Sequence, residues 1–308
     1  MKLAYLLKAH KNPSQVRRLI SRLATKESCF LLTIDRNSDF GSFRRELAKL
    51  PSDIPCYWIA PRQDGTWCGP GLVLSSLSAL EFALQMKEVP DHVYQISGQC
   101  YPIKPVRKII AFFEALGDRC VMECIPPPVS SWPDGGWSRI EKYHWHTPRW
   151  LPFDKGWRQY PEDRAGTTWK SRALDMVVRW KFPLPRKGPA CIDHYFGHAF
   201  WSLTPRAAEY VLRFHRQHPE VYRHHKYTFV LDEYFVQSIL GSSDEWRSKA
   251  TGTHLHYCDW TKPIRPAVLT MDYRNVLRET DWLMARKFDE TVDSSILDWI
   301  DRNLLEMN

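Results

Sequence analysis

The chain lacks several features that would place it outside the cytoplasm or give it a metal site. No apolar run approaches the roughly 18 residues needed to cross a bilayer, and the apolar stretch Leu3–Leu7 is too short for a signal peptide. None of its eight cysteines forms a C-x-x-C pair or stands at zinc-ligand spacing from a histidine, which predicts reduced thiols. We therefore expect a cytoplasmic protein, either free or in peripheral contact with the inner face of a membrane.

The sequence also contains no Asp-x-Asp, which removes a common way of holding a divalent metal against a phosphate. An anionic ligand would then need fixed cations, because electrostatic stabilisation is usually the largest catalytic contribution. The adjacent Arg286 and Lys287 are the candidates for this role. An Arg-Lys pair taken alone is more often a solvated helix face, so both interpretations stay open at this point.

The overall charge favours an anionic ligand other than nucleic acid. Formal net charge is +8 and the pI is about 9.0, which fits a nucleotide, a lipid phosphate or a membrane surface as partner. The basic residues are dispersed, however, and no helix-turn-helix, finger or RNA-binding signature is present. The 14 Trp, 13 Tyr and 14 Phe fit either stacking on sugars and bases or a densely packed core.

Hydrophobic periodicity predicts an α/β fold. Apolar runs typical of strands alternate with helical spacing up to about residue 124, which is the pattern of a parallel sheet. Ligands of such sheets bind beyond the carboxyl ends of the strands, where His10 and Asp35 fall. We expect strands over 3–9, 29–34, 56–60 and 92–96, a loop over 97–104, and helices over 14–23 (with Ser14 as N-cap), 72–87 and 106–116.

The rest of the chain is less regular. The Pro- and Gly-rich segment 125–189 predicts long loops, which often carry binding residues. The adjacent His224 and His225 are expected on the surface. We expect residues 1–124 and 125–308 to pack as two halves of one unit. The elements expected in the second half are strands over 195–203 and 255–258 and helices over 205–215, 231–240 and 294–305.

Three groups of polar residues could carry chemistry, each with an ordinary structural alternative. Asp232 and Glu233 open a predicted helix, where acids complement the helix dipole. One of them could equally be a general base that takes a proton from a hydroxyl. Asp35 could bind a ribose or a base, or could cap a loop. His10 is expected to be satisfied by backbone groups.

Several short motifs occur in a fixed order along nearly the whole chain. They are Ala4–Leu6 with His10–Pro13, Thr33–Arg36, Trp67–Gly69, Ser97–Lys104, Gly197–Trp201, Asp232–Phe235, Tyr257–Trp260 and Ala285–Asp289. In this series the chain resembles the core-2/I-branching β-1,6-N-acetylglucosaminyltransferase family, which includes the peptide O-xylosyltransferases. We expect a bacterial member.

The resemblance implies a GT-A-like, Rossmann-type nucleotide-sugar fold with a central, mostly parallel sheet flanked by helices. It also implies an inverting, metal-independent transfer from a UDP-sugar, with no cofactor. Residues 1–124 would form the nucleotide-sugar-binding half, and residues 125–308 the acceptor-binding and catalytic half. The implied site comprises Glu233 as catalytic base; Arg265, Arg286 and Lys287 at the diphosphate; His10, Asp35 and Trp67 at the nucleoside; and Glu123 and Arg139 at the acceptor.

Two positions depart from the family pattern. Cys100 stands where relatives usually have Asp, which affects the expected acceptor geometry near that loop. Ala199 stands where the xylosyltransferases have an acid proposed as the base, which favours Glu233 as base and N-acetylglucosamine over xylose. The implied partners are a UDP-sugar and a saccharide or glycolipid acceptor in glycan or polysaccharide biosynthesis. UDP-xylose transfer and a non-catalytic carbohydrate-binding role are the alternatives.

Overall fold

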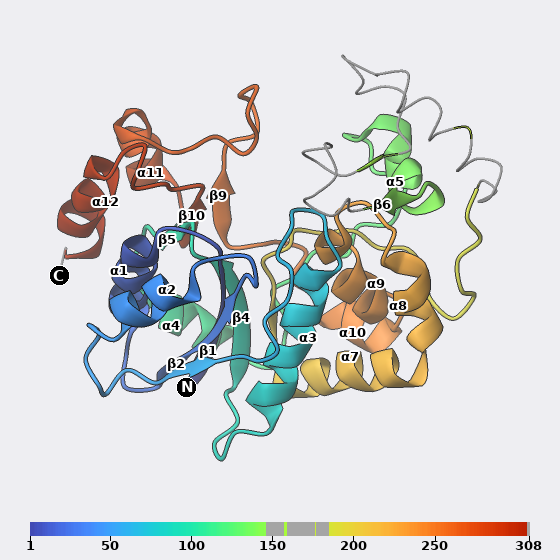
Figure 1. Cartoon of the computed structure of the whole chain (residues 1–308), viewed down its shortest axis with the longest axis horizontal. Coiled ribbons are helices and arrows are strands. Elements are labelled where there is room, and N and C mark those ends of the chain that lie inside the picture. The colour runs from blue at the N-terminus through green and yellow to red at the C-terminus, as the bar shows by residue number, and fades with distance from the viewer. Residues whose placement is uncertain (146–156, 159–175, 177–184, 307–308) are drawn as a thin grey trace.

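The structure, a computed structural model, describes residues 1–145, 157–158, 176 and 185–306. Its centre is a five-stranded, mostly parallel sheet (Figure 1). The strands are β1 (Leu3–Ala9), β2 (Ser28–Ile34), β3 (Cys56–Trp58), β4 (His92–Ser97) and β8 (Ser202–Leu203). Their order is β3-β2-β1-β4-β8, and only β8 runs antiparallel to its neighbour. The predicted α/β fold with a central, mostly parallel sheet is therefore confirmed.

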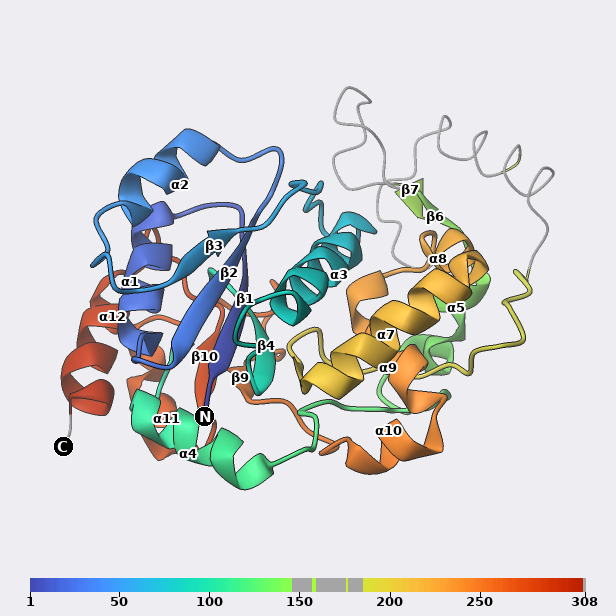
Figure 2. The same cartoon turned by 90° about the horizontal axis from the view of Figure 1, so that it is seen from below.

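Helices cover both faces of this sheet (Figure 2). Successive side chains of a strand point to opposite faces, so Tyr5 and Leu7 of β1 join one core cluster and Ala4 and Leu6 the other. The first cluster is completed by α1 (Pro13–Leu23), α2 (Phe40–Leu47), α4 (Val106–Leu116) and α12 (Ser295–Ile300); the second by α3 (Gly71–Leu84), α7 (Pro205–Gln217) and α9 (Phe235–Gly241).

A second, three-stranded sheet lies beside the first and includes part of the segment predicted as a loop over 97–104. Its order is β5 (Cys100–Pro102), β10 (Met284–Arg286) and β9 (His256–Cys258). Arg286 therefore lies on a strand, between Cys100 and Cys258. The interpretation of Arg286 and Lys287 as a solvated helix face is wrong. Strands of three residues are too short to show a periodic signal in the sequence.

The remaining elements are short and belong to the second half of the chain. They are η1 (Pro133–Gly136), α5 (Trp137–Glu141), the pair β6 (His144–Trp145) and β7 (Trp157–Arg158), α8 (Pro219–His225), η2 (Leu231–Glu233), α10 (Asp244–Lys249), η3 (Met271–Tyr273), α11 (Arg274–Glu279) and the π-helical η4 (Asp301–Leu305). No helix within the described ranges is both long and apolar enough to cross a bilayer.

Three predicted element boundaries are wrong. Helix α1 begins at Pro13, with Asn12 rather than Ser14 at the cap position, because proline is favoured in the first helical turn. The helix predicted over 231–240 is interrupted at Tyr234, whose φ of −129° is not helical. The strand predicted over 195–203 contracts to β8, preceded by an isolated bridge between Ile125 and Phe196.

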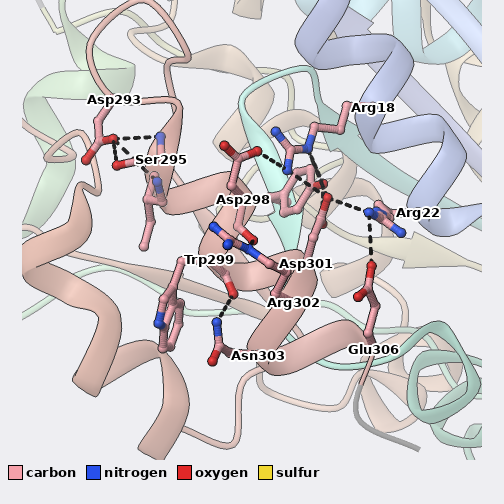
Figure 3. Close-up of polar contacts among 12 residues, drawn as sticks. Arg18, Arg22, Asp293, Ser295, Asp298, Trp299, Asp301, Arg302, Asn303 and Glu306 are labelled. Carbon is pink, nitrogen blue, oxygen red and sulfur yellow. Dashed lines mark hydrogen bonds and ion pairs between the residues drawn. The ribbon is translucent and has the colours of Figure 1, made fainter.

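A buried carboxylate joins the C-terminal helical segment to the first helix. Asp301 is 3% exposed and lies between Arg18 and Arg22 of α1 (Figure 3). Its Oδ2 accepts hydrogen bonds from Arg18 Nη2 at 2.8 Å and Arg22 Nη2 at 2.7 Å. Its Oδ1 accepts a hydrogen bond from the Tyr101 hydroxyl at 2.7 Å, which ties β5 to the same point. This cluster fixes the position of the chain end against the sheet.

We expect Asp301→Asn to lower the free energy of unfolding by about 2 kcal/mol, because it removes charge-assisted hydrogen bonds from a buried position. Urea denaturation measures this change. The matched control is Glu306→Gln, since Glu306 is 56% exposed and lies 3.5 Å from Arg22. An exposed pair of this kind contributes less than about 1 kcal/mol. Equal effects of the two substitutions would contradict the anchoring role of Asp301.

Candidate functional site

A pocket of about 1460 Å³ opens at the carboxyl ends of β1, β2 and β4. This is the edge of a parallel sheet at which ligands bind. The pocket brings together every residue that the sequence predicted for the site. Those residues are His10, Asp35, Trp67, Glu123, Arg139, Glu233, Arg265, Arg286 and Lys287.

Glu233 is a largely buried acid at the end of the single turn η2. One quarter of its side chain is exposed, and its Oε2 accepts a hydrogen bond from Arg139 Nη1 at 3.2 Å. Burial raises the pKa of Glu233 to about 7, with a further increase from the neighbouring charge of Asp232 and an opposing effect of Arg139. A carboxylate with this pKa can accept a proton near neutral pH and later release it.

Asp232 and Lys8 also line the pocket, and the charge of each affects the pKa of the other. Burial raises the pKa of Asp232, and the charge of Lys8 opposes this shift. Burial also lowers the pKa of Lys8 to about 8, while its Nζ donates a hydrogen bond to the carbonyl of Leu72 at 2.7 Å. Asp232 Oδ1 is buried and has no hydrogen-bond partner among the described residues. Lys8 was not among the predicted site residues, although a lysine inside the apolar strand Leu3–Ala9 is a visible signal.

Aromatic rings hold Arg139 in place beside Glu233. Its guanidinium lies 3.6 Å from the ring centroid of Trp132 and 5.6 Å from that of Phe229. Its main-chain carbonyl accepts a hydrogen bond from the backbone N–H of Phe229 at 3.0 Å. The sequence placed Arg139 on the acceptor side, and its ion pair with Glu233 was not foreseen. Neither Trp132 nor Phe229 stood in a motif that could have indicated this contact.

Arg286, the last residue of β10, and Lys287, which follows it, also line the pocket. Within the described part of the chain neither makes an ion pair with an acid. The Arg286 guanidinium lies 4.6 Å from the ring centroid of Phe200, and its Nε is buried with no hydrogen-bond partner in the same part of the chain. Burial, together with the charges of Lys11 and Arg286, lowers the pKa of Lys287. Unpaired positive charge of this kind attracts a polyanionic ligand.

Cys100 lies behind these cations rather than in the pocket. It is fully buried, and its Sγ accepts a hydrogen bond from the Ser97 backbone N–H at 3.4 Å. Burial raises the pKa of the Cys100 thiol, and the charge of Arg286 acts in the opposite direction. Cys100, the position that departs from the family pattern, therefore lies beside Arg286, with which it pairs across strands β5 and β10.

Arg265 approaches the pocket from its rim. It belongs to the segment between β9 and η3, part of which projects away from the sheet (Figure 1). The side chain is exposed, and its Nε donates a hydrogen bond to the carbonyl of Lys262 at 3.1 Å. Trp260 and Ile264 of the same segment are 46% and 81% exposed. Arg265 is thus less constrained by its surroundings than Arg286.

Two of the predicted nucleoside residues, His10 and Asp35, lie where β1 and β2 end, and the third, Trp67, lies in the loop between β3 and α3. Asp35 Oδ1 accepts backbone hydrogen bonds from Asn37 at 2.9 Å and Gly65 at 3.1 Å, so the loop-capping interpretation of Asp35 applies. Its Oδ2 has no hydrogen bond within the described chain, so one oxygen remains for a ligand. The His10 imidazole is exposed, and Trp67 is 60% exposed.

Glu123, predicted on the acceptor side, fixes the loop that contains Gly197 and His198. Its Oε2 accepts a hydrogen bond from the His198 backbone N–H at 2.9 Å. The chain at Gly197 passes so close that an added Cβ would lie 2.5 Å from the carbonyl oxygen of Glu123. Gly197 is therefore required by close backbone approach.

Possible metal ligands gather elsewhere. The donor atoms of Cys191, His218 and Glu220 lie within 4.8 Å of one another, and this is the one such group within the residues that the structure describes. None of these three residues lines the pocket.

The chain is similar to known proteins in sequence and in structure. The sequence model described as Branch, Core-2/I-branching enzyme, matches residues 3–280. Xylosyltransferase oxt of Drosophila melanogaster is 29% identical over 102 residues, which cover 33% of this chain but only 11% of that protein. Mouse xyloside xylosyltransferase 1 has a TM-score of 0.37 at 11% identity, with 92% of this chain and 97% of that one covered. An active-site mutant of LgtC has a TM-score of 0.41 at 9% identity, with 93% and 86% covered.

We expect Asp232→Asn to lower the pKa of Glu233 from its value of about 7, because the substitution removes a neighbouring negative charge. Carboxyl ¹³C NMR titration, with the signal assigned by its loss in Glu233→Gln, measures the change. Asp118→Asn is the control, since Asp118 is exposed and pairs with Lys249 away from the pocket. An unchanged or higher pKa in Asp232→Asn would contradict this account of Glu233.

Proposed function

Because the chain belongs to the Core-2/I-branching enzyme family, we propose that it is a glycosyltransferase that moves a sugar from a UDP-sugar to a hydroxyl of a saccharide. The transfer is a single displacement with inversion and needs no metal. One observation carries the proposal: a buried acid with a pKa of about 7 shares a pocket with two cations that have no acid partner within the described residues. A base and a diphosphate site are the two functions that such a transfer requires.

In the proposed reaction, Glu233 takes the proton of the acceptor hydroxyl while that oxygen attacks the anomeric carbon. The bond from this carbon to the diphosphate oxygen breaks on the opposite face, and UDP leaves with the electron pair. Lys287 and Arg286 neutralise the charge that develops on the diphosphate, and Arg265 assists from the rim. Each charge-assisted contact contributes about 1.5–3 kcal/mol to binding.

The two sides of the pocket bind the two substrates. His10, Asp35 and Trp67, in residues 1–124, hold the nucleoside. Glu123 and Arg139 contact the acceptor, a saccharide or glycolipid used in glycan or polysaccharide synthesis. N-acetylglucosamine is the proposed sugar. A UDP-xylose donor is the second candidate, favoured by the sequence match to a protein named as a xylosyltransferase.

We expect Glu233→Gln to lower kcat by about 10²–10⁴-fold, because general base catalysis contributes this much, while UDP affinity changes less than about twofold. Initial rates and calorimetry measure the two quantities. In the wild type, kcat/KM should rise with pH through about 7, since Glu233 must lose its proton to act as base. The exposed acid Glu114 provides the control variant Glu114→Gln. Wild-type rates in Glu233→Gln would rule out Glu233 as the base.

Lys287→Met and Arg286→Met are each expected to weaken UDP binding by at least about tenfold, from the loss of one charge-assisted contact. Binding of uridine, which has no phosphate, should stay unchanged, and EDTA should leave the transfer rate unchanged. The exposed Lys262 supplies the control variant Lys262→Met. Equal weakening of UDP and uridine, or a loss of activity on chelation, would contradict the assignment of the diphosphate to these cations.

A further inference from the structure

A continuous chain of hydrogen bonds runs behind the pocket, through residues that the mechanism above does not use. Arg186 Nη2 donates to Thr228 Oγ1 at 3.0 Å, and Thr228 Oγ1 lies 3.1 Å from His225 Nδ1. His225 Nε2 lies 3.2 Å from the Tyr234 hydroxyl, which lies 2.6 Å from His194 Nδ1. Arg186 is 7% exposed, and Thr228 and His225 are fully buried. The prediction that His225 lies on the surface is wrong.

In one arrangement of the protons, every hydroxyl of this hydrogen-bond chain donates to an acceptor. Arg186 can only donate, so Thr228 accepts from it and is left to donate its own proton to His225 Nδ1. His225 Nε2 then carries the imidazole proton and donates to the Tyr234 oxygen, and Tyr234 donates to His194 Nδ1. Burial lowers the pKa values of both imidazoles, most strongly that of His225, so both are neutral at neutral pH. Every hydroxyl proton in the chain then has an acceptor.

Two members of this hydrogen-bond chain, Arg186 and Tyr234, connect it to residues of the pocket. The Arg186 Nε donates to the carbonyl of Ile140 at 2.8 Å, and its backbone N–H donates to the carbonyl of Glu141 at 3.0 Å. Ile140 directly follows Arg139, and Tyr234 directly follows Glu233. The Arg139–Glu233 ion pair at 3.2 Å therefore closes a ring of contacts whose other side is the buried chain.

Arg186 has no carboxylate partner in the described residues, so its charge is held by main-chain dipoles and by the face of Tyr143, 5.0 Å from the guanidinium. A small cavity of about 70 Å³, lined in part by Arg186, His194 and His225, leaves room beside the chain. Because an unmade hydrogen bond at a buried charge is costly, loss of one link would displace Arg186 toward other acceptors. That displacement would move Ile140 and, with it, Arg139.

We propose that Thr228 and Tyr234 are positioning residues that keep Arg139 in contact with Glu233 through Arg186 and His225. This inference rests on the proposed function of Glu233 as base. The charged groups that face Glu233 are Arg139, Asp232 and Arg286, and Arg139 is the one that the buried chain holds.

The test uses two substitutions at one position. Thr228→Val removes the hydroxyl without changing the side-chain volume appreciably, whereas Thr228→Ser keeps it. We expect Thr228→Val to lower kcat by about tenfold through misplacement of the base, with the KM for the UDP-sugar unchanged. The acid limb of the pH profile should move to higher pH, because Glu233 loses the stabilising charge of Arg139. Thr228→Ser should restore both the rate and the pH profile.

A second break and a control make the result independent of folding defects. Tyr234→Phe interrupts the chain at another link and should reproduce the effects of Thr228→Val. Tyr222→Phe removes a hydroxyl from the half-buried Tyr222 of α8, which is not part of this series of hydrogen bonds. This variant should resemble the wild type. Equal impairment of Thr228→Val and Thr228→Ser, or a wild-type pH profile in a folded Thr228→Val, would overturn the inference.

NMR titration of Glu233 separates this inference from the proposed function. If the wild type transfers no sugar, the proposed function fails. The positioning role can still be measured, because Thr228→Val should raise the pKa of Glu233 while Thr228→Ser leaves it unchanged. This shift is opposite in direction to the one expected for Asp232→Asn.

Discussion

The contact of Asp289 with Lys11 and Asn12 holds the end of the chain against its beginning, and the pocket depends on it. Asp289 is 6% exposed, pairs with the Lys11 ammonium, and its Oδ1 accepts a hydrogen bond from Asn12 Nδ2 at 2.8 Å. Gln15 adds a hydrogen bond from its Nε2 to the carbonyl of Phe288 at 3.2 Å. Because Lys287 lies between this anchor and strand β10, its side chain is fixed at the carboxyl end of the central sheet.

The pairing of Lys11 also separates charges within the pocket. Asp289 pairs with Lys11, whereas the neighbouring Lys287 and Arg286 line the open pocket without an acid partner from the described part of the chain. On the other side, burial keeps Glu233 and Asp232 from ionising as readily as free acids. The charged groups of the site thus divide into two cations without an acid partner in the described residues and two acids whose pKa values burial raises. A ligand with a negative end and a neutral, hydroxyl-bearing end matches this division.

Much of this arrangement could be predicted from residues close together in the sequence, and the rest could not. The strands β1 and β2 were visible as apolar runs, and their ends placed His10 and Asp35 at the ligand edge. Of the second sheet, β9 was predicted, as a strand over 255–258. Strands β5 and β10 were not, so the pairing that places Arg286 between Cys100 and Cys258 could not be foreseen. Long-range pairing of short strands leaves no local pattern.

The side of the pocket that contains Glu233 shows the same limit. The acids at 232 and 233 could be identified as candidates, but the break in their predicted helix at Tyr234 and the contact with Arg139 depend on tertiary packing.

The late position of β10 in the sequence has a consequence for biosynthesis. During translation, the segment that carries Arg286 and Lys287 emerges after nearly all of the other elements have left the ribosome. Nascent chains that stop short of it have the central sheet but lack Arg286 and Lys287, so the pocket gains these two cations only late in synthesis.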